Sequence, residues 1–497
     1  MPLKTHFPST LRRRCDAVKY NIKDKSCPYE AVIGLEVHVE LKTESKIFCS
    51  CSTRFGDEPN ANVCPTCLGM PGTLPVLNRR AVDLALMCGL AFGCMINRES
   101  HFDRKNYYYP DLPKGYQITQ YEVPICEGGF VPITVDGEER LIELTRIHIE
   151  EDAGKLIHRG DKTLVNYNRA GVPLCEIVSE PDMHTPDEAK AYLESLRRIL
   201  SYIGVSDCKM NEGSLRCDVN VSVKRRDSDV LGVKCEIKNL NSINYVGKAL
   251  EDEIDRQISV LESGGEIRSE TRRFNESGGK TEHMRYKETA LDYRYFAEPN
   301  IPPIYLTNAY IDSIKRRMPK LPDATAEDIC EKYGVKWDDA VLLTSSRSIT
   351  EYFIACAEAT EFKTQCVNLF ISEILPVLGE DAKGQYITPE NMAEVCGVFG
   401  RGEVVSGAAK KLIHMSAESG DSPALIARRE NMLKITDAAE LMPYIHSSVV
   451  ACEKAVADYK KGKLTAIKQI VGAVMKSTGG RADPVLAEKM IEDELKK

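Results

Sequence analysis

The sequence predicts an α+β fold with a largely antiparallel sheet in its first part and an all-helical second part. Three observations support this prediction. Short runs with a period of two, separated by Gly, Pro and Asn, dominate from about residue 30 to 300; three helical stretches interrupt them; and from about residue 320 onward the periodicity is helical, with almost no strand signal. We therefore expect a sheet carrying a few helices, followed by helical domains.

The clearest predicted strand is "GSLRCDVNVSV", in which apolar and polar residues alternate. The apolar set would face one way and the polar set the other: Leu215, Cys217, Val219, Val221 and Val223 against Ser214, Arg216, Asp218, Asn220 and Ser222. One packed face and one open face favour an antiparallel or mixed sheet. The helices are predicted at residues 78–96, at 185–203, where Pro186 suits the first turn, and at 245–263.

Breaks in composition divide the chain into four segments. Residues 1–28 are predicted to be a disordered extension; Arg12, Arg13 and Arg14 weakly resemble a transit peptide, and a bacterial extension or a misassigned start codon explains them as well. The Pro-rich "EPNIPPIYL" and the following "KRRMPKLPDATAED" close a first domain at residues 29–318. A helical domain is predicted at 319–422, and the break "AESGDSP" introduces a small helical module at 423–497.

Composition limits the classes of protein that need consideration. A length of 497 residues predicts two or three domains with their own cores. The longest uncharged apolar stretch, residues 85–96, falls short of the roughly 20 residues that cross a bilayer. Eighteen cysteines, mostly isolated, predict a reducing compartment and therefore the cytoplasm. The net charge of −8 means that any nucleic acid must bind to a local basic patch.

The most specific short motif is a set of four cysteines. Cys49 and Cys51 form a CxC pair, and Cys64 and Cys67 follow as CxxC after twelve residues. Two such short turns supply the four thiolates of a closed tetrahedral zinc site, which has no open position for catalysis. The alternative is a chance cluster of thiols. The spacing predicts a structural zinc site that holds a loop.

A second set of polar residues has the composition of a hard-cation site. Glu36, His38 and Glu40 alternate with apolar residues and so share one strand face. Further carboxylates lie in strand-like stretches: Glu150, Glu151, Asp152, Glu176, Glu180 and Asp182. Carboxylates with one imidazole are typical of Mg²⁺ or Mn²⁺ sites that serve phosphoryl transfer. A solvated strand face would look the same.

The stretch "DRKNYYYPDLPKGYQ", residues 103–117, combines cations, amides and aromatic rings around two prolines. This composition suits the binding of a nucleotide or a terminal adenosine by stacking and charge. A packed surface loop explains it equally well. The stretch "SGGKT" at 277–281 ends like a phosphate-binding loop, but Phe274 occupies the position of its leading Gly, so ATP would not be held by a P-loop.

Near the C-terminus, residues 454–481 contain seven cations and a single acid, Asp458. The cations are Lys454, Lys460, Lys461, Lys463, Lys468, Lys476 and Arg481. Within an acidic chain, this balance indicates contact with a phosphate backbone. A solvated helix face is the alternative.

Taken together, the chain resembles the GatB family, the B subunit of tRNA-dependent amidotransferases. The matching stretches are "IGLEVHVEL", "CPTCLGMPGTLPVLN", "FDRKNYYYPDLPKGYQITQ", "EEDAGK", "NRAGVPLCEIVSEPD", "NEGSLRCDVNVSV", "KNLNSINYV" and "DYRYFAEPNIPP". The C-terminal "GKLTAIKQIVGAVMKSTGGRADP" resembles the YqeY-like tail of the family. The resemblance runs from about residue 29 to the end and implies a cradle-shaped catalytic domain, a helical domain and a tRNA-binding tail.

The resemblance also implies an activity. GatB proteins use ATP to phosphorylate the side-chain carboxylate of Glu-tRNA(Gln) or Asp-tRNA(Asn), and ammonia then displaces phosphate to give Gln-tRNA or Asn-tRNA. The ammonia comes through a channel from the amidase subunit GatA, and a small GatC subunit clamps the pair. Cofactors implied are ATP, Mg²⁺ or Mn²⁺, and Zn²⁺ in members that keep the cysteines.

The resemblance implies roles for particular residues. The Mg²⁺ ligands of the family correspond to Glu36, His38, Glu151 and Glu176. Contacts to ATP are predicted, from composition and strand facing, at Lys105, Arg216 and Asp218. Two other interpretations stay open at this point: a non-catalytic, zinc-containing tRNA-binding scaffold, and a ligase that amidates a free amino acid. Acids close to bound RNA argue against the scaffold, and the basic tail argues against the free-acid ligase.

Overall fold

The computed structural model describes residues 27–286, 293–379 and 385–495, and the chain divides into two compact units, Met1–Pro319 and Lys320–Lys497. The predicted extension lies outside the described residues up to residue 26. Sheets occur in the first unit, while the described part of the second unit is built from helices. This arrangement confirms the predicted α+β fold class, whereas the four-segment domain limits stay predictions.

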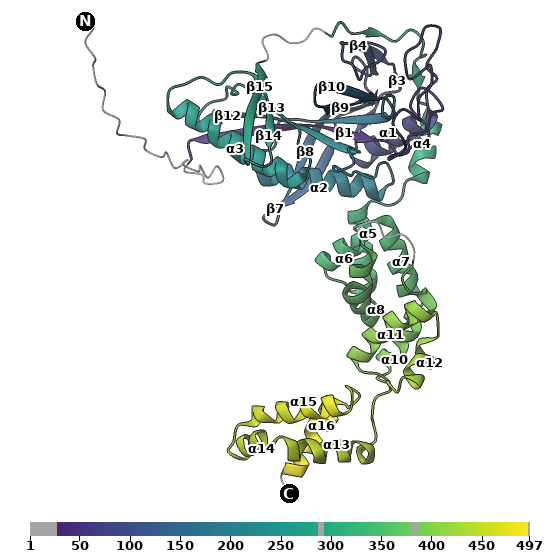
Figure 1. The fold of residues 1–497 in the computed structure, drawn as a ribbon, viewed down its shortest axis with the longest axis vertical. Helices are drawn as coiled ribbons and strands as arrows, with labels where there is room; N and C mark the ends of the chain where they lie inside the picture. The colour runs from purple at the N-terminus through teal and green to yellow at the C-terminus, as the bar shows by residue number, and fades with distance from the viewer. Residues whose placement is uncertain (1–26, 287–292, 380–384, 496–497) are drawn as a thin grey trace, which may run out of the picture. The chain divides into compact units, whose positions relative to one another are not determined.

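A ten-stranded sheet forms the centre of the first unit, in the order β15-β14-β13-β12-β1-β11-β8-β6-β2, with β7 paired to β8. Figure 1 labels several of its strands, among them β1, β8 and β12. Neighbouring strands are antiparallel except for β13 and β14, as predicted. The strands are β1 Tyr29–Glu40, β2 Met95–Ile96, β6 Cys126–Glu127, β7 Phe130–Val135, β8 Glu138–Glu151, β11 Pro173–Ser179, β12 Leu215–Arg225, β13 Cys235–Lys238, β14 Glu270–Asn275 and β15 Lys280–Tyr286.

Alternation along the central strands gives the sheet two different faces. On β1, Leu35, Val37 and Val39 are buried, whereas Glu36 and His38 on the opposite face are only half-buried. The predicted pattern of β12 is also found: its apolar positions are buried, and its polar positions are half-buried except for Ser222, which is buried as well. One face therefore belongs to the core, and the other leaves polar side chains open to ligands.

The described residues of the first unit form four helices: α1 Arg79–Ala91, α2 Pro186–Tyr202, α3 Ile243–Glu262 and α4 Asn308–Arg317. The helices α2 and α3 pack against each other and run across the large sheet (Figure 1). A capping box between Thr185 and Glu188 begins α2, with Pro186 in its first turn, as predicted. The third helix begins two residues earlier than predicted because Ser242 caps it by accepting from the Tyr245 amide.

The predicted helix at 78–96 is too long. It ends at Ala91, where the Phe92 amide donates to the Cys88 carbonyl. Gly93 then adopts a φ of +68°, a left-handed conformation that ends helices and suits glycine. The following Met95–Ile96 forms the edge strand β2.

Three small sheets accompany the large one in the described part of the first unit. They are β16-β4-β5, with Phe296–Ala297, Asp103–Asn106 and Tyr116–Thr119; β10-β9, with Lys162–Asn166 and Lys155–Arg159; and β17-β3, with Ile304–Tyr305 and Glu99–Ser100. The stretch "SGGKT" spans the turn between β14 and β15 and the start of β15. A phosphate-binding loop would instead lead from a strand into a helix.

The second unit contains two hydrophobic clusters, one formed by residues between 326 and 427 and one by residues between 435 and 491. Its elements are α5 Pro322–Tyr333, α6 Trp337–Leu343, α7 Arg347–Glu358, α8 Lys363–Leu369, η1 Phe370–Ile374, α9 Leu375–Leu378, α10 Pro389–Gly400, α11 Ser406–Ser419, α12 Pro423–Arg429, α13 Ala438–Ala451, α14 Glu453–Lys460, η2 Leu464–Ala466, α15 Ile467–Ser477 and α16 Pro484–Leu495. Within the described residues, no helix combines the length and apolar character that crossing a membrane requires.

Candidate active site and metal centres

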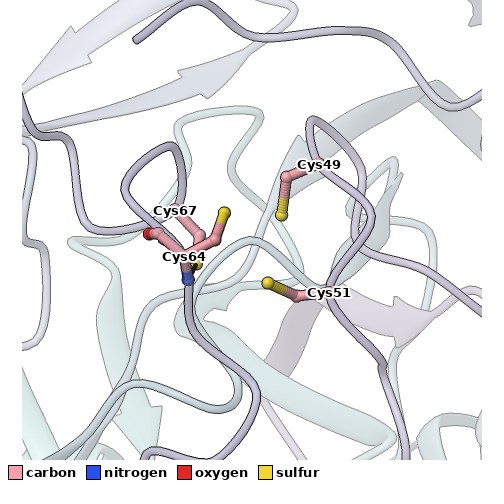
Figure 2. Close-up of side chains that lie close together, drawn as sticks. All are labelled: Cys49, Cys51, Cys64 and Cys67. Carbon is pink, nitrogen blue, oxygen red and sulfur yellow. Dashed lines mark hydrogen bonds between the residues drawn. The ribbon is translucent and has the colours of Figure 1, made fainter.

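The four cysteines of the predicted zinc site lie together in the structure. Their sulfur atoms are all within 4.8 Å of one another and come from two loop segments after β1. Figure 2 shows Cys49 and Cys51 on one side of a small space, and Cys64 and Cys67 on the other, with sulfurs directed inward. Zinc at about 2.3 Å from each ligand separates tetrahedral sulfurs by roughly 3.8 Å. The cluster therefore has the size and the soft ligands that zinc requires.

Hydrogen-bond donors and one positive charge lie around the most buried of these thiols, Cys67. A hydrogen bond from the Cys49 thiol, the Cys64 amide at 3.1 Å and the nearby charge of Lys46 lower the pKa of Cys67 to about 4. The Lys46 amine lies 3.6 Å from the Cys67 sulfur and donates to the Tyr167 carbonyl at 3.1 Å. Metal-binding cysteines act as thiolates, so this environment prepares Cys67 to bind zinc.

A cavity of about 220 Å³ adjoins the cysteine cluster. Cys49 and Cys67 contribute to one side of its lining, and Lys114 and Glu151 contribute to another. Lys114 and Glu151 form an ion pair at 2.5 Å, and the second oxygen of Glu151 accepts from the Ile118 amide at 2.9 Å. The cysteine loop is thus one wall of a polar cavity that reaches Glu151.

A second group of ligand-capable atoms lies on the open face of the large sheet. The Nε2 atom of His38 on β1 is 3.4 Å from Glu150 on β8 and 3.5 Å from Glu176 on β11. His148 of β8 adds a further imidazole, 3.2 Å from Glu176. The strand register explains this meeting, because Glu176 is directly opposite His38 on one neighbouring strand and His148 on the other.

The charges of this group balance one another closely. Burial opposes the charge on His38, but attraction to Glu176 and Glu150 outweighs it and raises the pKa of His38 to about 9. Burial, with repulsion from Glu176, raises the pKa of Glu150. Burial acts in the same direction on Glu176, yet attraction to His148 and His38 holds the pKa of Glu176 well below its usual range. The positive charge of protonated His38 thus partly neutralises the carboxylates. A divalent cation bound at this group can provide that neutralisation instead.

The distances also suit a small divalent cation. Adjacent ligands of octahedral Mg²⁺, each about 2.1 Å from the ion, are separated by roughly 3 Å. The separations of 3.4 and 3.5 Å in this group are close to that value, and they involve oxygen and imidazole nitrogen. His38, Glu150 and Glu176 can therefore hold Mg²⁺ or Mn²⁺.

The structure brings together only part of the ligand set that the family resemblance implied. Among the described residues, Glu36 lies within 4.8 Å of Asp218 and Glu236 in a separate group. The carboxylate of Glu36 also accepts from Asn220 at 2.9 Å. Glu151 is directed to the cavity described above, and its neighbour Glu150 joins the group of His38.

Comparison with known proteins gives two family matches. The model of the GatB/GatE catalytic domain matches residues 31–312, and the GatB domain model matches residues 351–495. The chain belongs to the GatB family.

Similar proteins support this assignment over nearly the full length. The B subunit of the aspartyl/glutamyl-tRNA(Asn/Gln) amidotransferase of Carboxydothermus hydrogenoformans is 47% identical over 479 residues, covering 94% of this chain and 99% of its own. The proteins of the same name from Thermoanaerobacter pseudethanolicus and Clostridium kluyveri are 49% and 45% identical over 473 residues, covering 94% of this chain and 100% and 99% of their own. The predicted family and enzyme class, an amidotransferase component of the ligase type, are confirmed.

Within this GatB structure, the predicted ATP-binding residues lie on two strands near the carboxylates. Lys105 on β4 is close enough to Glu150 and Glu176 that, although burial opposes it, their charges raise the pKa of Lys105. Arg216 on β12 donates to Asp152 at 2.8 Å. Asp218, two positions along, pairs with Lys238 at 2.5 Å and belongs to the Glu36 group. The charges of Lys105 and Arg216 thus both act on the His38 group.

The predicted cations of the C-terminal segment lie at both ends of α14, in the following turn, on α15 and, in the case of Arg481, just after α15. Six of them are exposed: Lys454, Lys460, Lys461, Lys463, Lys468 and Lys476. Arg481 differs, because it is half-buried and donates to the Asn431 side chain and the Thr478 carbonyl. The exposed lysines can contact phosphate groups, whereas the hydrogen bonds of Arg481 stabilise the C-terminal segment itself.

The sequence did not single out His148 or Glu236 as site residues. The family resemblance assigned Glu151 to the ligand set of His38, whereas the structure places Glu150 in that group. A signal for His148 was present, since "HIE" places His148 and Glu150 two apart on one strand face. His148 is buried, and its Nδ1 atom has no hydrogen-bond partner in the described part of the chain. Glu236 gave no such signal, because only strand pairing places it near Glu36.

Proposed function

We propose that this chain uses ATP to phosphorylate the side-chain carboxylate of Glu-tRNA(Gln), Asp-tRNA(Asn) or both, and then amidates it with ammonia. The family supports tRNA-dependent amidation in general, and the relatives carry that activity in their names. The observation that carries the ATP-dependent step is the group of His38, Glu150 and Glu176 on the open sheet face.

The proposed first step needs positioning more than proton transfer. A carboxylate oxygen of the amino acid attacks the γ-phosphorus of ATP, the bond to the bridging oxygen breaks, and ADP leaves. Because the attacking carboxylate is already ionised, no general base is required. His38, Glu150 and Glu176 would hold Mg²⁺ or Mn²⁺, which would neutralise the negative charge of the phosphate oxygens. Lys105 would contribute a second positive charge from β4.

In the second step, ammonia attacks the acyl carbon, the bond to the phosphoryl oxygen breaks, and phosphate and a proton leave. Ammonium has no lone pair for this attack, so neutral ammonia must be delivered away from bulk water. The family resemblance supplies the source: a GatA amidase subunit that makes ammonia, with a GatC subunit, in a heterotrimer. Zinc on Cys49, Cys51, Cys64 and Cys67 would hold the loop beside the cavity of Glu151 rigid.

The tail is proposed to bind the tRNA away from the reacting end. The exposed lysines around the α14–α15 turn, with Lys460, Lys461 and Lys463 among them, form a positive surface on an acidic chain. Such a surface attracts a phosphate backbone without reading its sequence.

The test is ATP hydrolysis by the chain assembled with its amidase partner, with and without Glu-tRNA(Gln) or Asp-tRNA(Asn), at varied Mg²⁺. Charged tRNA should stimulate hydrolysis strongly. Glu150→Gln and Glu176→Gln should each reduce the stimulated rate about 100-fold or more, because even groups that only orient metal ligands contribute about 10- to 100-fold. Glu143→Gln is the matched control, since Glu143 lies on the same strand as Glu150 but is exposed.

Each outcome has a definite meaning. Stimulation that is lost in Glu150→Gln and Glu176→Gln and kept in Glu143→Gln supports carboxylate activation at this group. Clear tRNA binding without stimulation by either charged tRNA refutes the proposal and leaves the tRNA-binding scaffold as the function.

A further inference from the structure

Five tyrosine rings form a continuous run in the first unit. Tyr109 contacts Tyr107 with ring centroids 6.4 Å apart, and Tyr107 contacts Tyr293 at 5.9 Å. Tyr293 contacts Tyr295 at 5.9 Å, and Tyr295 stacks on Tyr121 at 3.9 Å. The neighbouring rings lie edge-on except for this last, parallel pair. Residues far apart in the sequence therefore build one aromatic surface.

The small sheet β16-β4-β5 places these rings. Tyr107 and Tyr109 follow β4, Tyr121 follows β5, and Tyr293 and Tyr295 precede β16. Pairing of β4 with both other strands draws the three segments together. The run therefore lies in segments that directly flank hydrogen-bonded strands, which helps to preorganise it as a binding surface.

Two cations lie along the run. The Lys105 amine is 5.0 Å from the centre of the Tyr293 ring, and the Arg146 guanidinium is 5.8 Å from that of Tyr121. Lys105 is paired with Gln117 on β5, whose side chain donates to the Glu151 carbonyl at 2.7 Å, and the Gln120 side chain accepts from the Ile149 amide at 2.9 Å, so the run adjoins the end of β8 that carries Glu150. Rings interleaved with cations are the usual equipment for binding unpaired nucleotides.

Both ends of the run are open to solvent. Tyr109 is 55% exposed and Tyr121 is 50% exposed, although each ring touches a neighbour in the run. Their open surfaces leave room for a base to stack at either end.

We propose that this tyrosine run binds the unpaired 3′-terminal nucleotides of the aminoacyl-tRNA, with the terminal adenosine beside Lys105. The inference rests on the proposed function, since it places the aminoacyl ester next to the His38 group. An adenine base is also part of ATP, but ATP carries a single base, whereas five connected rings extend beyond what one base can cover. A strand of consecutive unpaired bases matches that extent.

The experiment uses an RNA minihelix whose terminal adenine is replaced by 2-aminopurine, added to the chain assembled with its partner subunits. Stacking on tyrosine should quench the fluorescence. Tyr121→Ala and Tyr295→Ala should weaken minihelix binding about 5- to 100-fold, and Tyr121→Phe and Tyr295→Phe should stay within about twofold of wild type, because phenyl rings stack equally well. Tyr305→Ala is the matched control, since Tyr305 is 67% exposed on β17, outside the run.

Steady-state kinetics show whether the tyrosines bind the adenine of tRNA or that of ATP. They also separate failure of the tyrosine assignment from failure of the proposed function. A raised KM for charged tRNA with an unchanged KM for ATP in the alanine variants supports the inference. A raised KM for ATP alone overturns it and assigns the rings to ATP. Alanine variants that match wild type, while wild type shows tRNA-stimulated hydrolysis, overturn only the tyrosine assignment. Absence of stimulation in wild type overturns the proposed function and this inference with it.

Discussion

Lys46 offers a sharp test of the proposal that the cysteine cluster binds zinc. Its side chain is fully buried, with the amine 3.6 Å from the Cys67 sulfur and 3.1 Å from the Tyr167 carbonyl. Lysine is almost never buried to this extent without a charged partner. Zinc with four thiolates has a net charge of −2, so the lysine has such a partner once zinc binds. We predict that Lys46→Met weakens zinc binding specifically.

The size of the effect follows from the geometry. Two unit charges about 4 Å apart attract by about 4 kcal/mol at an effective dielectric constant near 20. That energy corresponds to roughly a thousandfold in a dissociation constant, because each 1.4 kcal/mol is tenfold. The cost of burying the lysine offsets part of it. We therefore expect Lys46→Met to raise the zinc dissociation constant between about 10-fold and 1,000-fold.

The assay is a competition titration of the purified protein against a coloured zinc chelator. Lys42→Met serves as the matched control, because Lys42 belongs to the same loop but its side chain is 61% exposed and pairs with Asp207. Thermal unfolding at saturating zinc shows whether each variant folds. A folded Lys46→Met protein whose zinc dissociation constant stays within about threefold of wild type would refute the electrostatic argument.

Two further predictions concern the tail and the buried charges. Replacing Lys460 and Lys461 by Glu should weaken tRNA binding. It should also reduce the slope of the logarithm of the binding constant against the logarithm of the salt concentration by about 0.7 to 0.9 for each phosphate contact that is lost. Lys489→Glu, at an exposed position on α16, should change neither quantity, and filter binding at several salt concentrations measures both. Glu253→Gln should lower the free energy of unfolding by about 3 to 5 kcal/mol, because its buried carboxylate pairs with Arg256 at 2.7 Å. Burial opposes ionisation of Glu253, yet the hydrogen bond from Arg256 holds its pKa below the ordinary 4.5. The stabilisation from the Glu253 carboxylate is therefore complete above pH 4.5 and is lost as the pH falls below that value. The free energy of unfolding should consequently fall less steeply with decreasing pH in Glu253→Gln than in wild type. An equal slope in the two proteins below pH 4.5 would contradict this assignment.

Local patterns predicted much of this fold correctly. Alternation along "GSLRCDVNVSV" predicted which residues of β12 face the core, and Thr185 with Pro186 predicted the start of α2. Such features depend on residues a few positions apart, so they can be seen in the sequence. The end of α1 was missed because a single residue, Gly93, outweighs an apolar stretch that continues past it.

The sequence alone determined the family, the fold class and the cluster of four cysteines, because these depend on motifs and spacing along a short length of chain. Tertiary structure decided which carboxylate joins His38. Glu150 and Glu151 are adjacent in the sequence, but successive strand residues point to opposite faces, and only the pairing of β1, β11 and β8 places Glu176 between His38 and His148. Strand register joins residues more than a hundred positions apart, and no local pattern specifies it.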